Sequence, residues 1–80
     1  MRVTVIYFAA LRERAGRRES VEEIGPGTTA GSLWDVLASR EEFRGLATRP
    51  GLSVNGGWCG AGRVLVDGDE VGLLPPVSGG

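Results

Sequence analysis

The most constraining feature of this sequence is a run of β-branched and aromatic residues that begins at its third residue. The run, Val3 to Phe8, has the composition of a β-strand. Alternation along it places Val3, Val5 and Tyr7 on one face and Ile6 and Phe8 on the other. Both faces therefore carry apolar side chains, so the strand either lies covered in the centre of a sheet or uses one face to dock a partner.

Eighty residues provide one small core and no enclosed catalytic pocket, so the other elements must cover this strand within a single domain. Residues 9–15 predict a short helix that Gly16 ends. Residues 19–24 predict a weaker second strand, with Val21 as its apolar anchor.

A main helix is expected after the chain break at residues 25–27, with Thr28 or Thr29 as its N-cap. Trp34 is placed at the edge of its apolar stripe, and residues 40–42 on its solvated side. The stripe itself is predicted from side chains three and four positions apart, namely Leu33, Val36 and Leu37, continued by Phe43 and Leu46.

The second half of the chain predicts short strands joined by glycine-rich turns. Extended pieces are expected at residues 52–54, 58–59 and 64–66, with turns at residues 55–57 and 67–69. A final strand at residues 70–74 ends because the prolines after it cannot donate to a ladder. One main helix packed across a mixed sheet is an α+β roll of the β-grasp kind.

The charged residues exclude several classes of function. Ten acidic residues stand against nine basic ones, all of them arginine, so no basic surface predicts nucleic-acid binding. Without histidine or lysine, the chain lacks the most frequent general base, the commonest metal ligand and any Schiff-base amine. We therefore expect no metal and no cofactor on this chain, and no catalysis by the chain alone.

The single cysteine, Cys59, excludes an internal disulfide framework and a four-thiolate metal site. Cys59 is interpreted as a buried structural thiol, because no histidine, lysine or helix start is evident nearby to activate it. The acidic cluster Asp67, Asp69 and Glu70 is interpreted as a hairpin turn followed by a strand rather than as a metal site. No apolar run is long enough to span a bilayer, and a cytoplasmic location is expected.

The chain ends in a neutral tail. Residues 1–74 are expected to form the domain and residues 75–80 a flexible tail, with no charged side chain after Glu70. Such a tail can enter a narrow pocket without the cost of stripping water from a charged side chain. Its only charge is the α-carboxylate of Gly80, which is a poor acyl electrophile until it is activated. By itself, the terminal Gly79-Gly80 pair also fits a frayed chain end.

Residues 67–71, the apolar Leu73-Leu74 and the ending at residues 75–80 closely resemble the molybdopterin synthase small-subunit family. These MoaD/ThiS-like proteins are sulfur carriers of the ubiquitin-like β-grasp superfamily. Residues 7–13 resemble the family's first strand and the turn after it. The thiamin-pathway carriers also end in Gly-Gly, but their tails typically lack the Pro-Pro pair found here. Ubiquitin-like protein tags share the same ending.

The resemblance implies that an ATP-dependent activating enzyme adenylates Gly80 and that a sulfurtransferase supplies the sulfur of a thiocarboxylate. The tail would then enter the large subunit of molybdopterin synthase and donate sulfur for the molybdopterin dithiolene of the molybdenum cofactor. Alternatives are a ubiquitin-like protein modifier, or a carrier for thiamin or tRNA thiolation.

The resemblance also implies a docking surface for these partners, and an exposed apolar centre would suit that role. Its members would lie on the sheet face away from the main helix and along the tail, and they are Phe8, Arg12, Trp58, Leu74, Pro75, Pro76, Val77 and Ser78, ahead of Gly79 and Gly80. The alternative is that Trp58 caps a loop and Phe8 packs beneath it.

Overall fold

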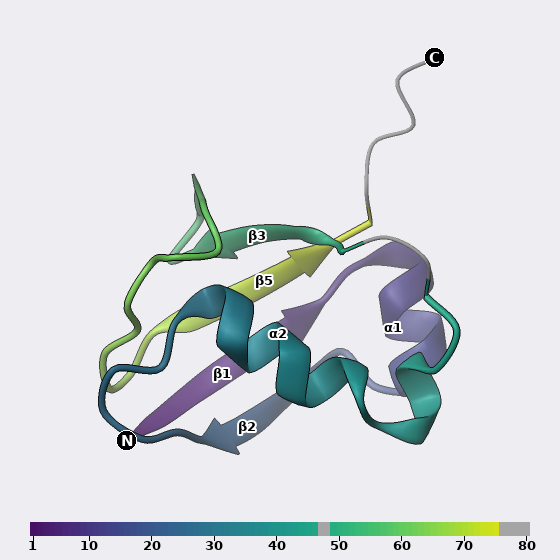
Figure 1. The fold of residues 1–80 in the computed structure, drawn as a ribbon. Helices are drawn as coiled ribbons and strands as arrows, with labels where there is room; N and C mark the ends of the chain where they lie inside the picture. Colours follow the sequence, from purple (N-terminus) through teal and green to yellow (C-terminus); the bar gives the residue numbers. More distant parts are fainter. Residues whose placement is uncertain (47–48, 76–80) are drawn as a thin grey trace.

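The computed structural model describes residues 1–46 and 49–75 of the chain (Figure 1). Strands and helices follow one another as β1 (Arg2–Tyr7), α1 (Ala9–Ala15), β2 (Glu19–Glu23), α2 (Ala30–Ala38), the short 3₁₀ helix η1 (Glu41–Phe43), β3 (Gly51–Val54), β4 (Gly57–Cys59) and β5 (Glu70–Leu74). The fold is α+β, as the sequence predicts.

The five strands form one mixed sheet in the order β2-β1-β5-β3-β4. β1 and β5 are parallel, and the other neighbours are antiparallel. The first and last strands of the chain are thus side by side in the centre of the sheet. Because they run in the same direction, the end of β5 lies beside the end of β1 (Figure 1).

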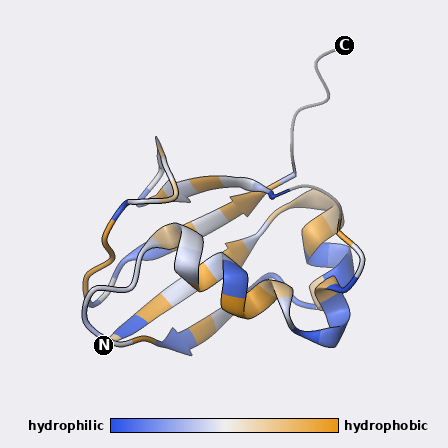
Figure 2. Cartoon of the chain, viewed as in Figure 1, coloured by the Kyte–Doolittle hydropathy of each residue, from blue (hydrophilic) through white to orange (hydrophobic). Residues whose placement is uncertain are grey.

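α2 lies across one face of the sheet and closes the core (Figure 1). Val3, Val5 and Tyr7 point into this core, as alternation along β1 predicts. Apolar and polar positions alternate along the strands in Figure 2. Phe43 fills the centre of the packing, with its ring centroid 5.6 Å from those of both Tyr7 and Trp34. An aromatic cluster therefore joins β1, α2 and η1.

α2 begins where the sequence predicts. Thr29 is the N-cap, and its hydroxyl accepts from Ser32 N at 3.1 Å. Thr29 N donates to Ser32 Oγ in return, at 2.9 Å, so both ends of a capping box are formed.

The predicted stripe of α2 is wrong at two positions. Val36 is 58% exposed, whereas Trp34 is only 5% exposed and belongs to the core. The helix turns Leu33, Trp34 and Leu37 towards the sheet, since Phe43 provides a ring on which the indole can pack. Phe43 and Leu46 do extend the apolar surface, as predicted.

The predicted role of Val21 is also wrong, because the side chain is 64% exposed. The register pairs Val21 with Thr4 and turns it away from the core. Ser20 and Glu22 take the inner face instead. Ser20 Oγ lies 2.8 Å from Tyr7 Oη and donates a hydrogen bond to Glu22 Oε2 at 2.9 Å. Both terminal nitrogens of Arg40 donate to the Glu22 carboxylate, at 2.7 and 3.1 Å.

Arg40 is thus a half-buried partner of β2 rather than part of a solvated face. The hydrogen bonds from Arg40 lower the pKa of Glu22, so the pair stays ionised. Further along the chain, residues 64–66 form no strand. Val64 makes one isolated bridge to Thr29, and Leu65 is buried beneath it.

Candidate functional site

Three of the predicted docking residues surround one hollow on the sheet face away from α2. Phe8, Trp58 and Leu74 line it together with Ser53 and Gly56, and its volume is about 210 Å³. None of the described residues that line it carries a charge. The hollow is therefore an apolar depression with one hydroxyl in it.

Phe8 is placed by the junction between β1 and α1. Its amide donates to Leu73 O at 3.2 Å, which ties the end of β1 to β5. Phe8 keeps extended dihedral angles as the N-cap of α1, and the next residue, Ala9, has a φ of 48°. The chain turns sharply there, so α1 leaves the sheet while the Phe8 side chain stays on its outer face, 42% exposed.

Two strand glycines lie against side chains that line the hollow. Gly72 lies opposite Ser53 in the ladder, and a Cβ on Gly72 would overlap Ser53 Oγ and come within 3.2 Å of Phe8 Cε2. A Cβ on Gly51 would lie 2.7 Å from Trp58 Cζ3. The rings can rest on the backbone because these strand positions lack a side chain.

The sequence interpretation singled out neither Gly51, Gly72 nor Ser53. The available signal was the glycine inside each strand, which marks a close approach of other atoms to the backbone. Which atoms approach depends on the strand order, so the signal alone could not assign these glycines to a site.

Trp58 is placed by the β3–β4 hairpin. Asn55 (φ 50°) and Gly56 (φ 85°) form its two-residue turn, and two positive φ angles suit the right-handed twist of the flanking strands. The indole is 70% exposed and leans over Gly51. Phe8 lines the same hollow and is also exposed, so much of its ring is left uncovered.

The hairpin is held to the start of β5 by a polar clamp. Asn55 Nδ2 donates to Asp69 Oδ1 at 2.9 Å, and Val66 N donates to Asp69 Oδ2 at 2.8 Å. Glu70 N donates to Asn55 Oδ1 at 2.9 Å. Asp69 is buried, and the backbone hydrogen bond from Val66, followed by that from Asn55, lowers its pKa.

Asp67, at the start of the same turn, also accepts a hydrogen bond from a backbone amide. Asp67 Oδ1 accepts from Arg2 N at 2.8 Å, which fastens the turn to β1. Among residues 1–46 and 49–75, no group of three or more Cys, Asp or Glu side chains is arranged to hold a metal ion. Residues 67–68 form a turn and Glu70 begins β5, which agrees with the prediction of a turn followed by a strand.

Cys59 is half-buried rather than fully buried. It ends the edge strand β4 opposite Leu52 and packs against the core from there. An edge strand is covered on one side only, which explains the remaining exposure of the thiol.

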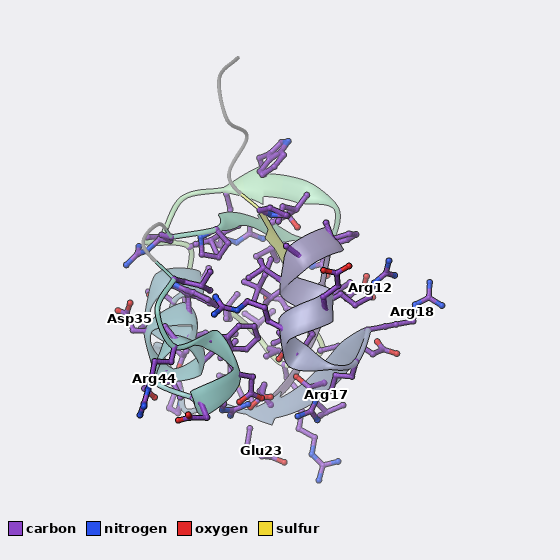
Figure 3. The ribbon with its side chains drawn as sticks, turned by 90° about the vertical axis from the view of Figure 1, so that its right-hand side faces the viewer. Arg12, Arg17, Arg18, Glu23, Asp35 and Arg44 are labelled. Atoms are coloured by element: carbon purple, nitrogen blue, oxygen red, sulfur yellow. The ribbon has the colours of Figure 1, made fainter. Side chains whose placement is uncertain are left out.

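The remaining predicted site residues lie beside the hollow or outside the described chain. Arg12 is on α1, is exposed and does not line the hollow, and Figure 3 shows it pointing away from the body of the protein. Pro75 is half-buried directly after Leu74. Pro76, Val77, Ser78, Gly79 and Gly80 lie outside the described residues.

The side chains that line the hollow supply apolar contact area and one hydroxyl group. Phenylalanine, tryptophan, leucine, serine and glycine offer no side chain that exchanges a proton near neutral pH. The hollow lies where β5 ends, so the chain continues towards Gly80 from its rim. No helix in the described ranges is long and apolar enough to cross a membrane.

Comparisons with known proteins agree in family and in fold. The ThiS family model matches residues 5–80. The molybdopterin synthase sulfur carrier subunit of Mycobacterium tuberculosis is 39% identical, over all of this chain and 99% of that protein.

Two solved structures extend the comparison. A putative molybdopterin converting factor subunit 1 from Pyrococcus furiosus superposes with a TM-score of 0.83 at 32% identity, over 96% of this chain and 99% of that one. The small archaeal modifier protein 1 of Haloferax volcanii superposes with a TM-score of 0.77 at 26% identity, over 95% and 98%. The chain is thus similar both to a named sulfur carrier and to a named modifier.

Proposed function

The chain belongs to the ThiS family, and on this premise we propose that it carries sulfur as a C-terminal thiocarboxylate for the molybdopterin dithiolene. In the proposed cycle, the Gly80 carboxylate displaces pyrophosphate from ATP and forms an acyl adenylate. Sulfur from a donor, at the oxidation level of sulfide, then displaces AMP and leaves the thiocarboxylate. The thioacid ionises readily, and its sulfur acts as the nucleophile in the next transfer.

The observation that carries this proposal is the position of the hollow at the end of β5. Residues 75–80 continue from its rim and span at most about 20 Å when extended. A partner that covers Phe8, Trp58 and Leu74 would therefore have the whole tail within reach. Tethering by the docked domain would raise the local concentration of the reactive terminus in the partner's pocket.

The proposed partners are the large subunit of molybdopterin synthase, an ATP-dependent activating enzyme and a sulfurtransferase. The match to a protein named as a subunit of molybdopterin synthase supports the first of these. The chain contains no histidine or lysine, so the partners would supply the acids and bases of every step. The proposed activation by ATP suits the cytoplasm.

Intact-mass spectrometry tests the proposal directly. The full chain, incubated with ATP, the activating enzyme and a sulfur donor, should gain the mass of one sulfur-for-oxygen exchange at Gly80. A chain with one alanine appended after Gly80 should fold normally and gain nothing. Equal labelling of both chains, or of neither, would contradict a terminal thiocarboxylate.

The likeness to a small archaeal modifier protein favours a second candidate, a covalent protein tag. Gly80 would then form isopeptide bonds with lysines of other proteins, visible as a ladder on a blot. Each acceptor would carry single tags, because this chain has no lysine on which a polymer could grow. Transfer of the sulfur to a thiazole precursor or to tRNA would retain the carrier chemistry and change only the acceptor.

A further inference from the structure

The hollow around Phe8 and Trp58 is lined by a single hydroxyl side chain, that of Ser53. We propose that Ser53 is a specificity-determining residue of this docking surface, and that the partner places a neutral hydrogen-bonding group against Ser53 Oγ with apolar side chains around it. This inference rests on the proposed function, in which the large subunit of molybdopterin synthase covers the hollow. It adds the chemistry that the covering surface must present.

Ser53 lies on the outer face of the sheet, in β3. It is paired with Gly72 of β5 on one side and with Trp58 of β4 on the other. A Cβ on Gly72 would overlap Ser53 Oγ and would come within 3.2 Å of Phe8 Cε2. The hydroxyl therefore lies over the backbone of Gly72, between the ring of Phe8 and the indole of Trp58.

Water reaches this hydroxyl in the free domain. Ser53 is half-buried, and its Oγ forms no hydrogen bond with residues 1–46 or 49–75. In those ranges, every side-chain oxygen or nitrogen that is sealed from solvent has a hydrogen-bond partner, so Ser53 Oγ cannot be sealed. A surface that covers the hollow would remove the water from Ser53 Oγ and would have to replace its hydrogen bond.

The other residues that line the hollow offer no replacement. Phenylalanine and leucine have no polar side-chain atom, glycine has no side chain, and the Trp58 indole is not bonded to Ser53. A purely apolar partner surface would therefore leave a hydroxyl covered and unpaired, which is unfavourable. A charged group is unfavourable as well, because no described residue that lines the hollow carries an opposite charge. A backbone carbonyl or amide, or a side-chain amide, meets both requirements.

Calorimetric titration of the large subunit with the full chain and with Ser53→Ala tests the inference through the sign of the change. If the partner pairs with the hydroxyl, Ser53→Ala leaves the partner's group unsatisfied in the interface, and binding should be about tenfold weaker or more. If the hydroxyl is covered without a partner, its removal should leave the affinity unchanged or higher. Either of those two results would overturn the proposal.

The melting temperature of Ser53→Ala should move by less than about 4 °C, because the hydroxyl has no hydrogen bond within the described domain. A larger fall would assign Ser53 to the fold instead of to the partner. Thr4→Ala is the matched control, since Thr4 is a half-buried hydroxyl residue of β1 that also lies on the outer face but does not line the hollow. An equal loss of affinity in the Thr4 and Ser53 variants would refute a role that is specific to Ser53.

Trp58→Ala separates this inference from the proposed function. Binding of the large subunit that Trp58→Ala weakens and Ser53→Ala does not would leave the docking role of the hollow in place and refute the role of Ser53. Failure of the unsubstituted chain to bind the large subunit would refute the proposed function and this inference with it.

Discussion

At the scale of single residues, Trp58 combines large apolar area with little apparent role in the domain itself. Its ring is 70% exposed and rests on Gly51, outside the core. Large aromatic side chains at the centre of an interface contribute most of the binding energy. A substitution of Trp58 therefore allows an effect on docking to be measured separately from an effect on folding.

We expect Trp58→Ala to change the free energy of unfolding by no more than about 0.5 kcal/mol. It should weaken binding to the large subunit of molybdopterin synthase by about 2 kcal/mol or more, because the hollow loses one wall. Denaturant titration and isothermal calorimetry measure the two quantities. Val66→Ala, at an exposed position that does not line the hollow, is the control and should leave both unchanged.

Asp69 has the opposite character, since it is buried and holds the turn that positions the hairpin. Replacing it by asparagine places an NH₂ group where Val66 N or Asn55 Nδ2 now donates. We expect Asp69→Asn to lower the free energy of unfolding at pH 7 by about 1–3 kcal/mol, the cost of an unsatisfied buried polar group.

The difference in free energy of unfolding between the unsubstituted protein and Asp69→Asn should depend on pH, because the pKa of Asp69 is lowered in the folded state. A carboxyl whose pKa is lower in the folded state stabilises the fold above its unfolded pKa of about 3.9. That contribution is lost as the pH falls through the folded pKa. Denaturation curves should therefore converge for the two proteins below about pH 4. A difference that stays constant down to pH 2 would assign the stabilisation to another group.

At the scale of elements, α2 is fixed by the loop that crosses its first turn. Ala30 N donates to Arg63 O and Gly31 N to Ala61 O, both at 2.9 Å. A Cβ on Gly31 would lie 2.7 Å from Ala61 Cβ and 3.0 Å from Ala61 O. The loop and the helix touch backbone to backbone, which only glycine permits at that position.

Gly31→Ala should therefore destabilise the protein by about 1–3 kcal/mol through overpacking, although alanine is the better helix former. Gly60→Ala is the matched control, because a Cβ there would meet nothing within 4 Å. Thermal unfolding of both variants checks the prediction. A Gly31→Ala protein as stable as the Gly60→Ala protein would show that the loop moves aside freely.

Sequence reasoning succeeded where the signal is local. The left-handed Gly16 that ends α1, the Thr29 cap and the alternation along β1 depend on neighbouring residues alone. It failed for Val21 and Val36, whose side of the element is decided by distant partners. The polar chain from Tyr7 to Arg40 gives the inner face of β2 to Ser20 and Glu22, and no local pattern encodes that choice.

The same division applies to the candidate site. Phe8 and Leu74 could be assigned to the outer face from their positions in the strands, and resemblance added Trp58. The close approach of Trp58 to Gly51, and of Phe8 to Gly72, depends on neighbours across the sheet, so it became visible only in the folded chain. The role of these residues in docking stays a prediction until the variants are measured.

At the scale of the whole molecule, the domain and the tail are predicted to be separable. The described core contacts involve residues up to Leu73, and the last ladder pair joins Leu74 to Gly51. Deleting Gly79 and Gly80 should leave the melting temperature unchanged and abolish formation of the thiocarboxylate. Differential scanning calorimetry and intact-mass spectrometry measure the two effects, and a lower melting temperature would show that the tail packs on the domain.

The central position of β5 has a mechanical consequence. Any force that pulls residues 75–80 out of a partner's pocket acts along β5, whose backbone is bonded to β1 on one side and β3 on the other. The force would then be shared by the hydrogen bonds of both ladders, which would be loaded in shear. At the edge of a sheet, by contrast, a strand can be peeled away one hydrogen bond at a time. The carrier could therefore be withdrawn from a tight pocket, and used again, without unravelling.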